Sequence, residues 1–477
     1  MANDTLAKPC LVEFIGTFFL AFTIGTAAGQ GASLAPLAIG SALMCAVYWG
    51  GHMSGAHFNP AVSLAACIRG KLRPVVCGCY MLAQFAASAV AFAAVSVVLP
   101  RSFSDDPKVG SPATGAGVEI GAAFVCELLL TFALCHTVLH TATSSAGAGN
   151  SYFGLAIGYT VLSGAISVGG VSGGAFNPAV GVLSLLNGLN VTKVLQLYFL
   201  APFLGGTLAG GLFHLTHPHE TSGGRVDKPA FADCAVEFVG TFMLCFTISL
   251  AASASNTSGL APVSIGAMLS AMVYAGGPSS GGHYNPAVSL GVLVRARAGG
   301  VDFGVAKAAA YMLTQGLAAV AASAAARAVL GSGVGHPELG MGVEVRAAWL
   351  AEFLGTLLLV SVVLQVATAP GTKGNSFFGL AIGFTVLSMA VSLGPISGGA
   401  FNPAVGLLAT LARGYSAEAA TTSLSVYLTA CPAAGLVAGL LFPLLTTGGE
   451  HASPHEAERT ALNVVDDKQE GDEELGR

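Results

Sequence analysis

Four copies of the tripeptide Asn-Pro-Ala are the most informative residues of this 477-residue chain. Each copy follows a Ser-Gly pair and a short loop, and each precedes an apolar run. Asn is a preferred N-cap and Pro fits the first helical position, so each copy predicts the start of a helix. The copies are Asn59-Pro60-Ala61, Asn177-Pro178-Ala179, Asn285-Pro286-Ala287 and Asn402-Pro403-Ala404.

The first two of these helices are too short to cross a membrane. The run from Asn59 to Arg69, like that from Asn177 to Asn187, has 11 residues, about 16 Å of helix or half the hydrocarbon core. Two such helices from opposite faces would meet at the centre with their positive N-terminal ends together. Each Asn oxygen can accept from its own helix, which leaves its NH₂ to bind water or a small neutral solute. The two helix dipoles would repel cations, and positive half-helix ends of this kind can exclude protons from a pore.

Four acidic residues interrupt apolar segments, where an unbound charge is costly. We expect each carboxylate to accept hydrogen bonds from the non-helical loop before an Asn-Pro-Ala motif, which leaves the loop carbonyls free for a lumen. A proton relay is the alternative. The four residues are Glu13, Glu127, Glu237 and Glu352.

Histidines offer three further candidates. His57 and His283 lie two residues before an Asn-Pro-Ala motif, and we assign them to loop packing, with pH gating as the alternative. His214, His217 and His219 are assigned to a flexible linker, with metal binding as the alternative. No cofactor and no metal site is predicted.

The composition indicates where these residues must work. Hydrophobic residues make up 53% and charged residues 9%, and the mean hydropathy is +0.73. So few charges cannot cover the surface of a soluble enzyme of this size, and no basic patch indicates a nucleic-acid partner. Twelve apolar runs of membrane-spanning length are predicted. They begin near residues 11, 34, 76, 117, 153, 195, 234, 261, 305, 343, 378 and 423.

The chain repeats itself. Val12-Glu13-Phe14 recurs as Val236-Glu237-Phe238, and the segment that begins at Phe153 recurs at Phe378. Within each half, two Asn-Pro-Ala motifs are separated by three spans, so they enter from opposite faces as an inverted repeat. We predict two units at 1–218 and 231–446, a linker at 219–230 and an acidic, disordered tail at 447–477.

Both halves resemble the major intrinsic protein family, the aquaporins and aquaglyceroporins, over about residues 8–218 and 231–446. The resemblance implies an all-α membrane protein of two tandem aquaporin-like units. Each unit would hold six transmembrane helices, two re-entrant half-helices related by inverted-repeat symmetry, and one pore. Because the family usually assembles four units, we expect a homodimer that forms a pseudo-tetramer in the lipid bilayer.

The sequence departs from the family at the narrow filter, where an Arg typically follows the second Asn-Pro-Ala motif. Val180 and Val405 stand there instead, followed by Gly181 and Gly406 rather than the Asp of aquaglyceroporins. Both filters read Ile, Ala, Gly, Val, which predicts a wide, apolar constriction. The predicted filter residues are Ile39, Ala165, Gly174 and Val180, and Ile265, Ala390, Gly399 and Val405.

The sequence therefore predicts a passive channel for water and small neutral solutes such as glycerol, urea, ammonia and hydrogen peroxide, and not an enzyme. A coupled secondary transporter and a non-conducting structural membrane protein are the alternatives. Basic residues at the predicted loops favour cytoplasmic termini, six against three. The six are Lys8, Arg69, Lys71, Arg73, Arg225 and Lys228, and the three are Arg101, Lys108 and Lys193. Either the plasma membrane or an intracellular membrane is compatible with this pattern.

Overall fold

The computed structural model describes residues 4–99, 109–221, 226–411 and 417–446. Within these ranges the chain is helical and contains no strand. The predicted tail at 447–477 lies outside the described residues. The described part of the first half ends at residue 221, and that of the second half begins at residue 226.

The long helices begin close to the predicted positions in both halves. Those of the first half are α1 (Asp4–Gly29), α2 (Ala35–Ser54), α4 (Pro74–Val98), α5 (Ile120–Val138), α6 (Phe153–Ser172) and α9 (Ala201–Thr216). The π-helical turn η2 (Leu139–Thr143) extends α5, and α8 (Val191–Val194) and η4 (Leu195–Leu200) run into α9. Those of the second half are α11 (Ala232–Ala251), α12 (Ala261–Ser280), α14 (Val305–Leu330), α15 (Val345–Thr368), α16 (Phe378–Ser397) and α19 (Ala417–Leu445).

Among the described residues, ten helices are long and apolar enough to cross a membrane. The other two predicted spans, α2 and α12, have the required length of 20 residues but are less apolar. Polar or small residues near their C-terminal ends, such as His52 and Pro278, explain the lower hydropathy. Both helices pack between neighbours of their own half, α2 against α1 and α6, and α12 against α11 and α16.

Short helices begin at each Asn-Pro-Ala motif. They are α3 (Pro60–Ile68), α7 (Pro178–Leu186) and α13 (Pro286–Ala296). The fourth is broken into two pieces, α17 (Pro403–Gly406) and α18 (Leu408–Leu411), with Leu407 between them. The ends of α3 and α7 match the sequence prediction, with Asn at each N-cap and Arg69 and Asn187 at the C-caps.

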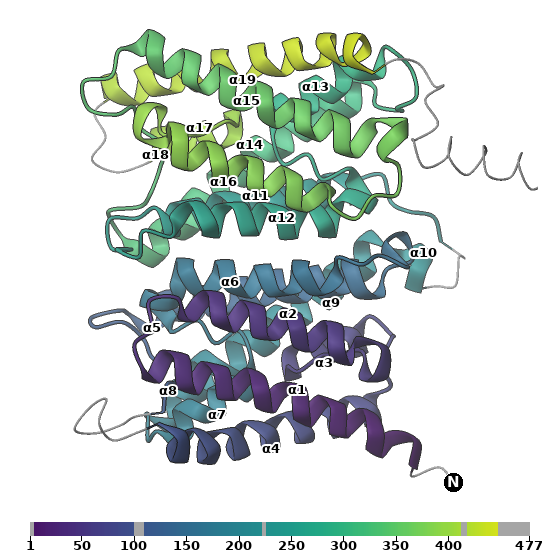
Figure 1. Cartoon of the computed structure of the whole chain (residues 1–477), viewed down its shortest axis with the longest axis vertical. Helices are drawn as coiled ribbons and strands as arrows, with labels where there is room; N and C mark the ends of the chain where they lie inside the picture. Colours follow the sequence, from purple (N-terminus) through teal and green to yellow (C-terminus); the bar gives the residue numbers. More distant parts are fainter. Residues whose placement is uncertain (1–3, 100–108, 222–225, 412–416, 447–477) are drawn as a thin grey trace, which may run out of the picture.

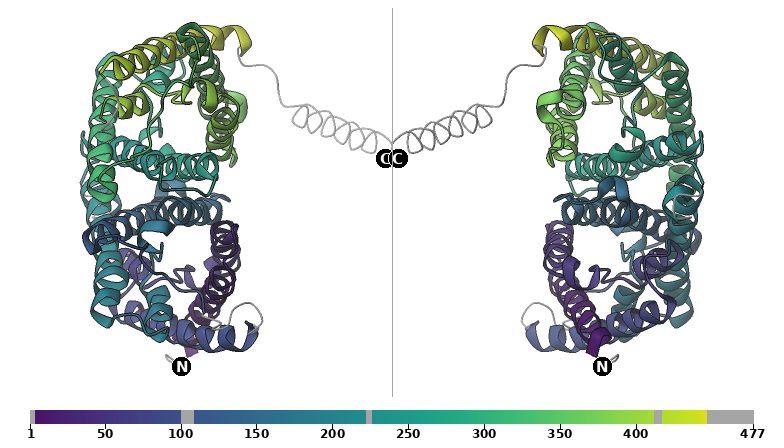
Figure 2. Two further views of the ribbon diagram at one scale, coloured as in Figure 1. Left: turned by 90° about the vertical axis from the view of Figure 1, so that its left-hand side faces the viewer. Right: turned by 90° about the vertical axis from the view of Figure 1, so that its right-hand side faces the viewer.

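The two halves lie one above the other, as Figures 1 and 2 show, and meet along α6 and α12. Ser163 donates to the backbone carbonyl of Ser264 at 2.8 Å, and Ser264 returns a bond to the carbonyl of Ser163 at 2.9 Å. At the other end of this contact, the rings of Tyr152, which precedes α6, and Tyr274 of α12 stack with centroids 4.3 Å apart. Polar contacts of this kind hold apolar helices together where lipid offers no hydrophobic driving force.

Glycines allow the short helices to approach their neighbours closely. A Cβ placed on Gly206 of α9 would lie 2.5 Å from the carbonyl oxygen of Ala61 in α3. A Cβ on Gly211, in the same helix, would meet no atom within 4 Å. The backbone of α9 therefore packs directly on the N-terminal turn of α3, as small residues permit in membrane helices.

We predict that Gly206→Ala destabilises the fold by about 1–3 kcal/mol, the usual effect of overpacking, because the carbonyl of Ala61 must move. Gly211→Ala serves as the matched control and should leave stability unchanged. Thermal unfolding of both variants in detergent provides the measurement. Equal midpoints would contradict the close packing of α9 on α3.

Candidate functional site

The Asn side chains cap the four short helices. The Oδ1 atom of Asn59 accepts from the N–H of Ala61 at 2.9 Å, and Asn177 caps Ala179 at the same distance. Asn285 and Asn402 repeat the bond with the residue two positions ahead, at 2.9 Å in each case. All four Asn residues have extended backbone, typical of an N-cap.

A second set of bonds ties the paired short helices to each other. The amide Nδ2 of Asn59 donates to the carbonyl of Phe176 at 2.8 Å, and that of Asn177 donates to the carbonyl of Phe58 at 2.9 Å. The second half contains the same crossed pair, from Asn285 to Phe401 at 2.8 Å and from Asn402 to Tyr284 at 2.9 Å. The sequence analysis left each NH₂ wholly free for a lumen, which is wrong for one of its two hydrogens.

The residue before each Asn has a left-handed backbone that aims its carbonyl at the opposite Asn. The φ angles are 48° at Phe58, 50° at Phe176, 50° at Tyr284 and 47° at Phe401. Such angles are uncommon for bulky residues, so the surroundings must hold them. The sequence analysis did not single out these aromatic residues.

Glycines on the long helices leave room for the four aromatic rings. A Cβ on Gly16 would overlap the ring of Phe58, and one on Gly240 would overlap the ring of Tyr284. Gly164 and Gly355 stand in the same relation to Phe176 and Phe401. Glu13, Glu237 and Glu352 are each followed by Gly three residues later, and this repeated spacing could have signalled the arrangement.

Buried carboxylates hold the loops that carry these aromatic residues. Glu13 accepts from the backbone N–H groups of His57 at 2.9 Å and Phe58 at 2.7 Å, and from the hydroxyl of Ser54 at 2.6 Å. Glu127 accepts equivalent bonds from Ala175, Phe176 and Ser172 at 3.0, 2.7 and 2.7 Å.

The second half repeats this arrangement. Glu237 accepts from the N–H groups of His283 at 2.9 Å and Tyr284 at 2.7 Å. Glu352 accepts from those of Ala400 and Phe401 at 2.9 and 2.7 Å. All four Glu residues are fully buried. Each carboxylate thus supplies acceptors to loop N–H groups that have no helical carbonyl to bond.

Glutamines and tyrosines complete the support of the loops. Gln84 donates to Glu13 at 2.8 Å, and Gln315 donates to Glu237 at 2.9 Å. A tyrosine hydroxyl also donates to the carbonyl of the Ser that begins each loop, at 2.6–2.8 Å. These tyrosines are Tyr80, Tyr198, Tyr311 and Tyr427. Sequence reasoning missed them because they lie on helices without a recognisable motif.

A cavity opens beside the crossed Asn residues in each half. The first has a volume of about 170 Å³ and the second about 90 Å³, and either volume can hold water. Both Asn residues of the half line each cavity, and so do all four of its predicted filter residues. These are Ile39, Ala165, Gly174 and Val180 in the first cavity and Ile265, Ala390, Gly399 and Val405 in the second.

The two loop histidines also line the cavities. The Nδ1 atom of His57 lies 3.1 Å from the hydroxyl of Ser63, and that of His283 lies 3.1 Å from the hydroxyl of Ser289. The rings of Tyr80 and Tyr311 pack edge-on against them. Both histidines therefore border a cavity while their rings are held by a serine and a tyrosine of the same half.

The histidines at the junction of the halves differ from the sequence prediction. His217 is buried rather than part of a flexible linker: it stacks on Phe213 and hydrogen-bonds Thr216 and Ser279. The ring of His214 contacts the carbonyl of Ile68. No group of His, Cys, Asp or Glu among the described residues has the geometry to hold a metal ion.

Comparison with known proteins places these features in a family. The family model described as Major intrinsic protein matches residues 1–214, 155–281 and 225–442. Aquaporin NIP1-1 of Zea mays is 33% identical over 263 residues, 49% of this chain and 87% of the relative. Glycerol uptake facilitator protein-like 6 of Lactiplantibacillus plantarum is 35% identical over 182 residues, 35% of this chain and 78% of the relative.

Two further similarities are more partial. The chain spans 62% of the length of aquaporin NIP1-4 of Oryza sativa subsp. japonica, at 37% identity over 175 residues. The solved aquaglyceroporin from Plasmodium falciparum aligns with 44% of this chain and 95% of its own, at 22% identity and a TM-score of 0.40. On the matches that together reach from residue 1 to residue 442, this multi-pass membrane protein belongs to the major intrinsic protein family, with the family's sequence in tandem.

Proposed function

We propose that the protein is a passive channel for water and small neutral solutes, with one pore in each half. The observation that carries the proposal is the cavity of each half. Its lining includes the tips of two capped short helices and the four apolar filter residues. The units at 1–218 and 231–446 each contain one complete set of these elements. The names of the relatives, aquaporins and a glycerol uptake facilitator, support this class of function.

The crossed Asn residues would orient each water or solute molecule that passes through the pore. Because Asn59 and Asn177 each use one N–H on the opposite loop, one N–H of each amide is left to donate to a solute oxygen. A water held through its oxygen turns its hydrogens away, which interrupts a proton wire. The N-terminal ends of α3 and α7 converge at this point and repel cations.

The constriction sets the range of solutes. Ile39, Ala165, Gly174 and Val180 place no charged side chain in the first cavity, and their counterparts place none in the second. Without a fixed positive charge and its donors, glycerol, urea, ammonia and hydrogen peroxide should pass as well as water.

The exposed surface supports a homodimer. Tyr152 and Tyr274 stack between the halves and are 7% and 1% exposed, whereas their repeat equivalents, Phe377 and Tyr48, are 51% and 39% exposed. In a second copy the same aromatic pair would form between α16 of one chain and α2 of the other. Two such contacts close a ring of four pores. The distribution of basic residues, six against three, supports termini in the cytoplasm as part of this proposal.

The channel function is tested with purified protein in vesicles, by stopped-flow light scattering after sucrose, glycerol, urea or ammonium shocks. We expect faster water and solute equilibration than in empty vesicles. Ala165→Trp combined with Ala390→Trp fills both cavities and should return the rates to the empty-vesicle level. Flux that saturates and requires an ion gradient would instead indicate the coupled transporter.

The width of the filter is tested by a charged substitution. Val180→Arg with Val405→Arg adds a long cationic side chain to each constriction, and we predict at least tenfold slower glycerol and urea flux. Val180→Leu with Val405→Leu adds volume without charge and should retain most of the urea flux. Glycerol and urea rates unaffected by Arg would refute a wide apolar filter.

The dimer is tested at the exposed aromatic residue. Phe377→Ala removes both copies of the proposed aromatic contact, each worth about 0.5–1.5 kcal/mol beyond its buried area, so association should weaken about tenfold or more. Leu440→Ala, on the exposed side of α19, is the control. Light scattering across a detergent dilution series measures the association, and equal dissociation of the two variants would contradict the proposed interface.

A further inference from the structure

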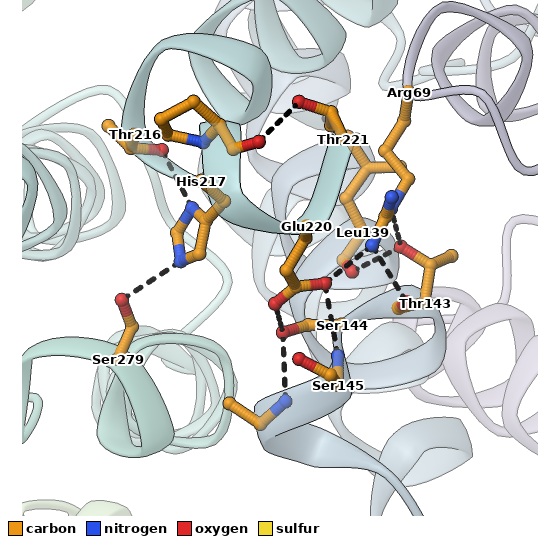
Figure 3. Close-up of polar contacts among 12 residues, drawn as sticks. Arg69, Leu139, Thr143, Ser144, Ser145, Thr216, His217, Glu220, Thr221 and Ser279 are labelled. Atoms are coloured by element: carbon orange, nitrogen blue, oxygen red, sulfur yellow. Dashed lines mark hydrogen bonds and ion pairs between the residues drawn. The ribbon is translucent and has the colours of Figure 1, made fainter. Parts of the chain in front are cut away.

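Residues 217–221, here called the linker arm, fold back onto the first half. The arm contains the single-turn helix α10 (Pro218–Thr221). Glu220 forms an ion pair with Arg69 at 2.6 Å, and the two side chains are only 5% and 3% exposed. Figure 3 shows Glu220 between Arg69, at the end of α3, and the turn that follows η2. This polar segment therefore does not behave as a solvated connector.

The first half supplies a complete set of donors to this carboxylate. The hydroxyl of Ser144 donates at 2.7 Å and the backbone N–H of Ser145 at 3.1 Å. Arg69 is in turn fixed by Thr143, through its Nε at 2.9 Å and its Nη2 at 3.0 Å. Burial alone raises the pKa of Glu220. The hydrogen bonds from Ser144 and Ser145 and the charge of Arg69 more than offset this effect, so the pKa lies below its ordinary value.

The second half lacks these donors at the equivalent positions. An offset of 225 residues replaces Ser144 by Ala369 and Ser145 by Pro370, which removes the hydroxyl and the N–H. Arg295, the counterpart of Arg69, bonds Thr368 and the carbonyl of Gly299. Within the described part of the chain, Arg295 forms no ion pair. Among the residues that the structure describes, the carboxylate and its donors therefore form a matched set in the first half alone.

An open cavity lies beside Arg295, at the place where Glu220 stands in the first half. It measures about 850 Å³, and Arg295, Thr368, Ala369 and Pro370 are among its lining residues. It also shares His283 with the smaller cavity of the second half. The equivalents of Arg295, Ala369 and Pro370 are the three residues that bind Glu220 in the first half. The linker arm therefore contacts the first-half counterparts of residues that line an open cavity in the second half.

His217 braces the linker arm at its other end. Its Nδ1 lies 2.8 Å from the hydroxyl of Thr216, and its Nε2 lies 3.1 Å from the hydroxyl of Ser279, near the end of α12. Its ring is stacked on Phe213 with centroids 4.6 Å apart. Burial and the neighbouring His140 lower the pKa of His217 to about 3, so the ring is neutral at physiological pH.

We propose that the linker arm is a built-in plug for the vestibule of the first pore, held by Glu220, and that none of the described residues of the second half plays this part. The proposal rests on the channel function proposed above. The connection between the halves then does more than join them: it makes the permeability of one pore depend on the state of the linker. Displacement of residues 217–221 opens the first pore and leaves the second unaffected.

The plug is tested in full-length protein with one pore filled at a time. In the Ala390→Trp background only the first pore conducts, and Glu220→Ala should raise its water permeability at least threefold in reconstituted vesicles. In the Ala165→Trp background only the second pore conducts, and Glu220→Ala should change nothing. Glu344→Ala, which removes an exposed carboxylate elsewhere, is the control in both backgrounds.

A second variant keeps the proposal testable if Glu220→Ala misfolds. Ser144→Ala with Ser145→Pro introduces the residues that the second half carries at these positions, and it should produce the same rise. Unchanged or reduced first-pore permeability in both variants, with monodisperse protein in gel filtration, overturns the plug. If vesicles with the wild-type protein are no more permeable to water than empty vesicles, the channel function is refuted and the plug with it. If the pores conduct but neither variant changes their permeability, the plug alone is refuted.

Discussion

The structure depends on hydrogen-bond partners for the N–H groups of non-helical backbone that lies at membrane depth. Hydrocarbon offers no partner to a loop N–H, and each unbonded group there costs several kcal/mol. Glu13, Glu127, Glu237 and Glu352 meet this requirement from the long helices, each with two backbone N–H groups of a loop. Because the acids are fully bonded within their loops, burial of four carboxylates is compatible with the fold and does not require a proton pathway.

The geometry of the helix tips follows from that support. Once the N–H of Phe58 is fixed on Glu13 and its ring is seated over Gly16, the left-handed backbone directs its carbonyl to Asn177. Phe176 makes the reciprocal contact with Asn59. Neither short helix can shift along its axis without breaking a bond at the other tip. The cavity beside them is thus bordered by polar groups whose positions are set before any solute arrives.

The sequence predicted the architecture well because its signals are local and repeated. Apolar runs located the long helices, and an N-cap followed by proline located the short ones. The crossed Asn bonds were missed because they join residues more than a hundred positions apart. The buried arm around Glu220 was missed for a different reason. A short polar segment is typical of a solvated linker, and only the folded chain brings Arg69 and Ser144 within bonding distance of the Glu220 carboxylate. The fourth short helix breaks at Leu407, directly after Gly406; this glycine could not have predicted the break, because α7 has Gly181 at the equivalent position and continues to Leu186.

The stacked contact between α6 and α12 has a consequence for the whole assembly. In the homodimer proposed above, each polypeptide contributes one copy of each half. If a two-fold axis relates the two chains, unlike halves are neighbours in the ring and like halves lie on its diagonal. Separate subunits could assemble in any mixture and order, but covalent linkage enforces a fixed one-to-one stoichiometry. In the proposed dimer the two halves are thereby free to diverge in sequence without producing a ring composed of only one of them.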